Sequence, residues 1–120
     1  MNRKRKRVPA AGDVVLLEFP GAREVKRRPA VVVSSSLYHR LRPDIVVGLI
    51  TSQIKGATSP TDYVLEDWRS VGLHQPSAYR TFLVTLPSSA VSHYIGKLST
   101  IDLEQVRKCL QLALSHVDSP

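Results

Sequence analysis

The chain has 120 residues, 42% of them hydrophobic, which is enough for one small globular domain with its own core but not for two. Its 17 Lys and Arg residues outnumber 10 Asp and Glu residues, so the net charge is +7, and this excess favours a phosphate-rich partner. The single cysteine, Cys109, excludes an internal disulfide and a multi-cysteine zinc site, and no apolar run reaches the roughly 20 residues of a membrane span. We therefore expect a globular protein of a reducing compartment, with no membrane segment and no signal peptide.

Most of the chain predicts short β-strands. Runs of β-branched and aromatic residues are separated by turn signals such as Pro20-Gly21, and these runs cover residues 14–19, 30–34, 44–51, 63–65, 79–86 and 93–98. The continuous apolar runs in the second and third strands indicate strands that are covered on both faces or that curl into a small barrel. Pro29 is expected to open the second strand, because proline cannot donate to the ladder of a central strand, so residues 22–28 form a basic loop.

The last part of the chain changes period and predicts an amphipathic helix. Ser99 and Asp102 form a capping-box-like start, and Cys109 falls beside the apolar stripe as a packed, structural thiol. The predicted fold class is therefore mainly β (α+β), a small β-barrel with a C-terminal amphipathic helix, in a single domain at residues 11–118 after a basic, disordered tail at residues 1–10. The apolar stripe recurs at steps of three and four residues, at Leu103, Val106, Leu110, Ala113, Leu114 and Val117.

The positive charge is concentrated in two segments. Residues 3–7 are all Lys or Arg and contribute +5, whereas residues 23–42 hold six basic side chains against one acid and contribute another +5. A run such as residues 3–7 is most often a solvated tail. The second segment is interrupted by strand-like sequence, so a fold must display its charge, and it is the candidate surface for a phosphate backbone.

Several familiar chemistries have no motif in this chain. We find no glycine-rich phosphate loop, no G-x-S-x-G, no H-E-x-x-H and no C-x-x-C, and therefore expect neither a metal nor a cofactor. Polar residues instead gather at the edges of the predicted strands. Each has a purely structural interpretation: Arg28 as a solvated cation, Thr51 as a hydroxyl that caps a turn, and Arg80 as an ion-pair partner of Glu66 or Asp67. The four histidines have no metal-ligand spacing and are interpreted as surface or packing residues: His39, His74, His93 and His116.

Five short motifs, taken in order and spacing, resemble the MazF/PemK toxins of bacterial toxin-antitoxin systems over residues 11–115. The resemblance implies an SH3-like or CcdB-like β-barrel, a homodimer, and a cytoplasmic, metal-independent endoribonuclease that cuts single-stranded RNA and is silenced by an antitoxin protein. The motifs are Gly12-Asp13-Val14-Val15, residues 27–34, Ile50-Thr51-Ser52, Gly72-Leu73 with Pro76-Ser77-x-x-Arg80, and residues 95–99.

By the same resemblance, Arg28 and Thr51 match the catalytic arginine and threonine of the family. Metal-free cleavage usually lets the ribose 2′-hydroxyl attack the adjacent phosphate, so the site must stabilise a more negative phosphorane. We assign Arg28 to the phosphoryl oxygens and the leaving group, since its fork can hold two oxygens, and Thr51 to a hydrogen bond that fixes the scissile phosphate. The expected RNA-binding residues are Arg23, Lys26, Arg27, Ser52, Gln53, Ser77 and Arg80.

The general base stays open at this point. Some family members have an acidic residue two positions after the arginine that matches Arg80, but here that position is Phe82, and Glu24 or His39 are candidates instead. Two other functions remain: a nucleic-acid-binding module without catalysis, and a CcdB-like, non-enzymatic toxin that acts on DNA gyrase. A gyrase poison needs no phosphate clamp, so Arg28 and Thr51 favour the nuclease.

Overall fold

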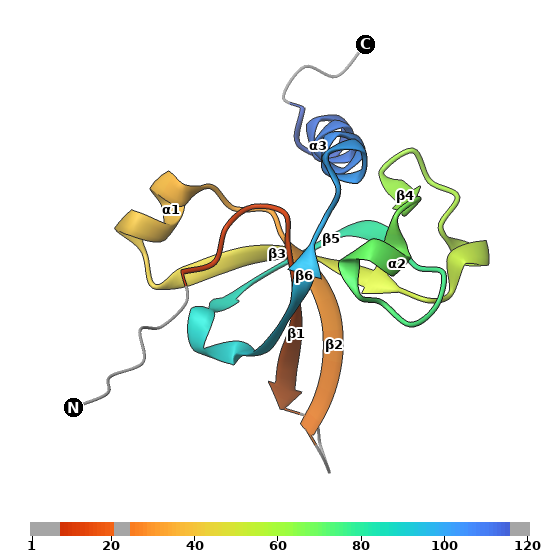
Figure 1. Cartoon of the computed structure of the whole chain (residues 1–120). Helices are drawn as coiled ribbons and strands as arrows, with labels where there is room; N and C mark the ends of the chain where they lie inside the picture. Colours follow the sequence, from red (N-terminus) through yellow and green to blue (C-terminus); the bar gives the residue numbers. More distant parts are fainter. Residues whose placement is uncertain (1–7, 21–24, 116–120) are drawn as a thin grey trace.

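The computed structural model describes residues 8–20 and 25–115 (Figure 1). The strand pairings are all antiparallel, in the sheet order β4-β5-β3-β2-β1-β6. The mainly β class with a C-terminal helix is thus confirmed. In chain order the elements are β1 (Asp13–Pro20), β2 (Val25–Val32), α1 (Ser36–Leu41), β3 (Asp44–Thr51), the 3₁₀ turn η1 (Ile54–Gly56), β4 (Asp62–Val64), α2 (Trp68–Val71), β5 (Ala78–Pro87), the 3₁₀ turn η2 (Ser88–Ala90), β6 (Val91–Lys97) and α3 (Thr100–Leu114).

The sheet is coiled around one of its two cores. This cluster joins β1, β2 and β3 through Val15, Ala30 and Val47, and Val84 of β5 and Val91 of β6 pack against it. Because β5 and β6 lie on opposite sides of the central strands, the sheet must curl to bring both to the same cluster. Among the described residues the end strands β4 and β6 do not pair with each other, so the predicted barrel is an open one.

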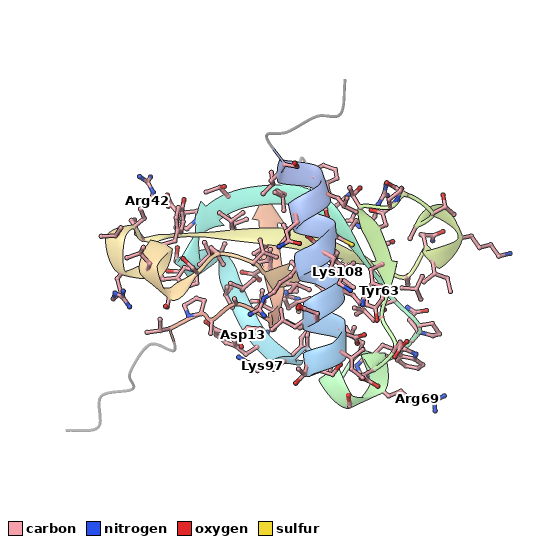
Figure 2. The ribbon with its side chains drawn as sticks, turned by 90° about the horizontal axis from the view of Figure 1, so that it is seen from above. Asp13, Arg42, Tyr63, Arg69, Lys97 and Lys108 are labelled. Carbon is pink, nitrogen blue, oxygen red and sulfur yellow. The ribbon has the colours of Figure 1, made fainter. Side chains whose placement is uncertain are left out.

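Helices α2 and α3 cover the other face of the sheet. The second cluster contains Val14 and Val31 of the sheet, Val71 of α2, and Val106 and Cys109 of α3. Figure 2 shows α3 lying across the strands. Burial raises the pKa of the Cys109 thiol, as expected for a packed, structural cysteine. The central strands are therefore covered on both faces, as their continuous apolar runs predicted.

Strand β2 begins earlier than the sequence predicts. Lys26, Arg27 and Arg28 pair with β1 instead of forming a basic loop, and Pro29 lies inside β2, opposite Leu16. The prediction that Pro29 opens the strand was therefore wrong. The proline is tolerated because β2 pairs with β3 only at residues 30–32. Before Ala30 the strand pairs with β1 alone among the described strands, so the missing N–H of Pro29 breaks no pairing with β3.

The two short helices were not predicted from the sequence. Helices α1 and α2 have six and four residues, which is too short for a helical period to be visible. Helix α3 begins as predicted, with the Ser99 hydroxyl accepting from the Asp102 N–H at 3.2 Å, and it ends at Leu114; Val117 lies outside the described residues. In the described part of the chain no helix is long and apolar enough to cross a membrane.

The segment before β1 is anchored by a buried carboxylate. Gly12 has the left-handed φ of +94°, which favours glycine, and its N–H donates to the Val32 carbonyl at 2.8 Å. Asp13 is 1% exposed, and its carboxylate accepts from the Ala10 N–H at 2.9 Å and pairs with Lys97 at 3.2 Å (Figure 2). Residues 8–10, which we assigned to the tail, thus belong to the described structure, where Pro9 is buried.

A second buried carboxylate ties α3 to the start of α2. Asp102 is fully buried, and it accepts from the Tyr63 hydroxyl at 2.6 Å and from the N–H groups of Glu66 at 3.1 Å and Asp67 at 2.9 Å. Burial and the hydrogen bond to Asp102 raise the pKa of Tyr63 above the ordinary tyrosine range. The side chain of Asp102 therefore fixes the turn from which α2 begins.

Helix α2 packs on β6 at a separation that only glycine permits. A Cβ on Gly96 would lie 1.9 Å from the carbonyl oxygen of Val71, the last residue of α2. The helix then ends at Gly72, whose φ of +112° is left-handed and whose N–H donates to the Arg69 carbonyl at 3.1 Å. The two glycines together set the direction in which residues 73–75 leave the helix.

Replacing Gly96 by alanine is expected to lower the free energy of unfolding by about 1–3 kcal/mol, because the new methyl group overlaps the Val71 backbone and forces α2 away from β6. Urea unfolding followed by circular dichroism measures this loss. Gly56→Ala is the matched control, since a Cβ there meets nothing within 4 Å, and its effect should stay within about 0.5 kcal/mol. Equal stability of the two variants would contradict the close packing of α2 on β6.

Replacing Asp102 by asparagine is expected to lower the free energy of unfolding by about 1–3 kcal/mol, because an amide has one acceptor oxygen for three donors and turns an N–H₂ group toward the others. The same unfolding measurement applies. Glu104→Gln makes the same chemical change at an exposed position of α3 and should have almost no effect. If both variants lose equal stability, Asp102 does not hold the turn before α2.

Candidate functional site

A cleft of about 720 Å³ opens where β2 and β3 separate. Their pairing ends at Ala30 opposite Leu49, next to Pro29, which has no N–H to donate. Extending this antiparallel register by two residues on each strand sets Arg28 opposite Thr51. Both residues line the cleft, so the structure brings together the two residues that the family resemblance predicts to be catalytic.

Three strands supply one side of the cleft. His93 of β6 pairs with Leu16 of β1, and Leu16 pairs with Pro29 of β2, so these residues form a row across the sheet. The loop that follows α2 supplies the opposite side, and its path depends on the left-handed Gly72. The other lining residues are Ile50, Ser52, Gln53, Leu73, His74, Gln75, Ser77, Tyr94 and Ile95.

Arg28 gives the cleft its charge. Its exposed guanidinium has no ion pair or side-chain hydrogen bond within the described ranges, whereas the neighbouring Arg27 pairs with Glu18 at 3.1 Å. None of the described residues that line the cleft is an Asp or a Glu. The cleft is therefore a positively charged hollow, in which a planar donor fork is available for an anion.

Thr51 combines a structural role with the proposed one. Its hydroxyl oxygen accepts from the Gln53 N–H at 3.0 Å, which confirms the expectation of a strand-end hydroxyl that caps a turn. A hydroxyl that accepts one hydrogen bond can still donate its own proton. Thr51 is half-buried at the end of β3, so the turn orients a donor toward the cleft.

The cleft contains some of the expected RNA-binding residues. Ser52 and Gln53 line it and are exposed. Ser77 also lines it but is only 4% exposed, and its hydroxyl donates to the Gln75 carbonyl at 2.8 Å. The hydroxyl of Ser77 thus shapes the loop after α2.

Other expected RNA-binding residues lie elsewhere. Lys26 and Arg27 are on the β1–β2 hairpin and do not line the cleft, and Arg23 lies outside the described residues, as does Glu24. Arg80 lines a separate cavity of about 420 Å³ together with Phe82. It pairs with Asp62, its cross-strand neighbour, at 3.7 Å, and not with Glu66 or Asp67 as expected.

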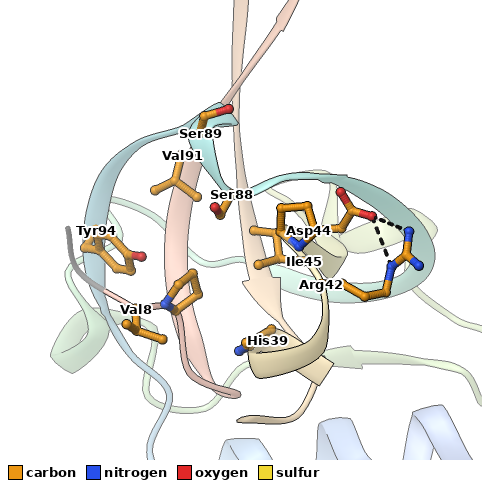
Figure 3. A pocket seen from close by; sticks show the side chains of 11 residues that line it. Val8, His39, Arg42, Asp44, Ile45, Ser88, Ser89, Val91 and Tyr94 are labelled. Carbon is orange, nitrogen blue, oxygen red and sulfur yellow. Dashed lines mark hydrogen bonds and ion pairs between the residues drawn. The ribbon is translucent and has the colours of Figure 1, made fainter. Parts of the chain in front are cut away.

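His39 is a candidate base that the structure places outside the cleft. It lies on α1 and lines another cavity, of about 470 Å³, beside the hydrogen-bonded pair Arg42 and Asp44 (Figure 3). Its Nε2 is 2.5 Å from the Ser34 hydroxyl, and its buried Nδ1 has no hydrogen-bond partner among the described residues.

Two histidines line the cleft and were missed as site residues. His74 follows α2 and His93 lies on β6, and both are exposed. No sequence pattern marks them, because they come from elements that only the fold brings together. In the described residues no group of three or more His, Cys, Asp or Glu side chains is arranged to hold a metal ion.

The fold is similar to several solved structures. These include a MazE–MazF complex, form III, from Deinococcus radiodurans, at a TM-score of 0.75 and 24% identity over 92% of this chain and 100% of that one. They include an endoribonuclease in complex with its cognate antitoxin from a mycobacterial species, at a TM-score of 0.73 and 19% identity, covering 92% of this chain and 99% of that one. They also include an endoribonuclease from a mycobacterial species, at a TM-score of 0.73 and 20% identity, covering 98% of this chain and 100% of that one.

No curated protein sequence matches the chain. The family model for the PemK-like, MazF-like toxin of type II toxin-antitoxin systems, however, matches residues 10–114, which include every strand, every helix and the whole cleft. The chain therefore belongs to the PemK-like, MazF-like toxin family of type II toxin-antitoxin systems.

Proposed function

We propose that this toxin is an endoribonuclease that cuts single-stranded RNA in the cleft between β2 and β3. The observation that carries the proposal is that Arg28 and Thr51 line the same cleft, whose described lining has no carboxylate. A hollow of this charge attracts a phosphodiester, and two different donors meet where the phosphate would lie. Two of the similar structures have the name endoribonuclease, which supports the same activity.

In this proposal Arg28 stabilises the charge that develops during cleavage. The ribose 2′-oxygen attacks the adjacent phosphorus, and the P–O5′ bond breaks, in a step that needs no metal ion. The guanidinium of Arg28 donates to the phosphoryl oxygens and the leaving oxygen. Thr51 donates to a phosphate oxygen and fixes its position, because its own acceptor site is occupied by the Gln53 N–H.

We also propose a homodimer and an antitoxin protein as partners in the cytoplasm. Two similar structures are complexes with an antitoxin or with MazE, which supports the second partner. Large apolar side chains stay exposed on α1, β5 and the end of α3, and such surface is typical of protein interfaces. These side chains are Leu37, Leu41, Phe82, Leu112 and Leu114.

One observation favours a second candidate function. The cleft has no described Asp or Glu that could act as a carboxylate base, and Phe82 lies in a separate cavity. A protein with this cleft can bind RNA through Arg28 without cutting it. The second candidate is therefore a nucleic-acid-binding module without catalysis.

The test is incubation of the purified protein with a long, mixed-sequence RNA in EDTA, followed by mapping of new 5′ ends. The wild-type protein is expected to cut at discrete sites, and Arg28→Ala to fold normally but to cut at least about a hundredfold more slowly, because it lacks the donor to the phosphorane. Arg107→Ala is the charge-matched control, since Arg107 is exposed on α3, away from the cleft.

The controls separate the candidate functions. An equal loss of cleavage in Arg28→Ala and Arg107→Ala would mean that net charge, and not the cleft, determines the activity. Intact RNA with the wild-type protein, together with binding that weakens steeply as salt rises, would support the binding module instead of the nuclease.

A further inference from the structure

The proposed reaction needs a proton acceptor that Arg28 and Thr51 do not supply. A guanidinium stays protonated, and an alcohol is too weak a base at neutral pH. The described lining of the cleft contains no Asp or Glu, so the imidazoles of His74 and His93 are its remaining groups of suitable chemistry.

His93 and Arg28 line the same cleft from different directions. His93 is opposite Leu16, whereas Arg28 is opposite Leu17, the next residue of β1, and so leaves β2 on the other face of the sheet, at the edge that does not pair with β3. Strands β6 and β2 flank β1, so their backbones are separated by about 10 Å, twice the spacing of neighbouring strands. Side chains that line one cleft from two such strands can reach opposite sides of a single phosphodiester.

A β-bulge orients the ring of His93. The β1–β6 register shifts between Leu16 and Leu17, which leaves Ser92 as the extra residue on β6. The Ser92 hydroxyl donates to the Leu16 carbonyl at 3.1 Å, and its oxygen lies 3.4 Å from Nδ1 of His93. Because a serine hydroxyl has one proton, Ser92 can only accept from this nitrogen.

This arrangement selects one tautomer. With the Ser92 proton directed to the Leu16 carbonyl, a hydrogen bond between Ser92 and Nδ1 of His93 requires the tautomer whose proton is on Nδ1 and whose lone pair is on Nε2. His74 has no hydrogen bond to a described residue that would orient its ring in the same way, and it lies on a loop instead of a strand. Of the two imidazoles in the cleft, His93 is the one held with a defined acceptor nitrogen.

We propose that His93 is the general base of this toxin, an inference that rests on the proposed ribonuclease function. Nε2 takes the proton of the ribose 2′-hydroxyl as the 2′-oxygen forms its bond to phosphorus. The P–O5′ bond breaks with its electron pair on O5′, which takes a proton from water, and the imidazolium later returns its proton to solvent. The products are a 2′,3′-cyclic phosphate and a 5′-hydroxyl.

Other titratable groups line the same cleft as His93, and they affect the interpretation of a pH–rate profile. Arg28 lines the cleft from β2, His74 from the loop after α2 and Tyr94 from β6 itself, although Tyr94 also packs against the other core and lines the cavity with His39, and β1 contributes the apolar Leu16. His74 is the other imidazole in this set. A variant of each histidine is therefore needed to assign an acidic limb in a pH–rate profile.

The experiment measures single-turnover cleavage from pH 5 to 9, in EDTA, of an RNA oligonucleotide that contains a mapped site. The wild-type rate should fall about tenfold per pH unit on the acidic limb, as protonation removes the base. His93→Gln should cut about 10²–10⁴-fold more slowly and lose this limb. Added imidazole should restore part of the rate of His93→Ala, which a purely structural role would not allow.

Binding and stability are measured alongside. An oligonucleotide with a 2′-deoxy group at the cleavage site should bind His93→Gln within about threefold of the wild-type affinity, and unfolding should be unchanged within about 0.5 kcal/mol, as is usual for an exposed residue.

The outcomes separate this inference from the proposed function. Cleavage by His93→Gln at the wild-type rate with an intact acidic limb would overturn the role of His93 and leave the ribonuclease standing. Loss of the limb in His74→Gln, and not in His93→Gln, would move the base to His74 and overturn the assignment as well. No cleavage by the wild-type protein would overturn both.

Discussion

The site depends on the early end of one hydrogen-bond ladder. Strand β2 has seven residue pairs with β1 but only three with β3, and its contact with β3 stops beside Pro29. Because proline has no N–H, the ladder loses a donor at this point and the two strands separate. Arg28 and Thr51 then lie on either side of the gap, so one backbone constraint creates the cleft and brings two functional groups to it.

The other wall of the cleft is set by tertiary contacts. Asp102 of α3 accepts from the N–H of Asp67 and fixes the start of α2, while the absence of a side chain at Gly96 lets the end of α2 touch β6. Gly72 then turns residues 73–75 toward the cleft. A loop outside the helices and strands thus receives its position from a buried carboxylate and two glycines.

Local patterns predicted most of the fold, whereas contacts between distant segments decided most of the site. Strands and α3 were visible because apolar periodicity is local, but α2 has four residues, and contacts with Asp102 and Gly96 hold its start and its end. Arg28 and Thr51 were found through the order of short motifs. No local pattern marked His93, since it reaches the cleft only through the pairing of β6 with β1.

The same register leaves Arg28 without an acid opposite it, unlike three other cations of the sheet. Surface ion pairs add little to stability, but each neutralises a positive charge that would otherwise attract phosphate. Arg28 is opposite the buried Leu17, so no acid faces it across the hairpin. Its charge is thereby left for a ligand, at the place where β2 and β3 separate. By contrast, three other cations lie directly opposite an acid on the next strand, in the pairs Glu18 and Arg27, Asp62 and Arg80, and Asp13 and Lys97.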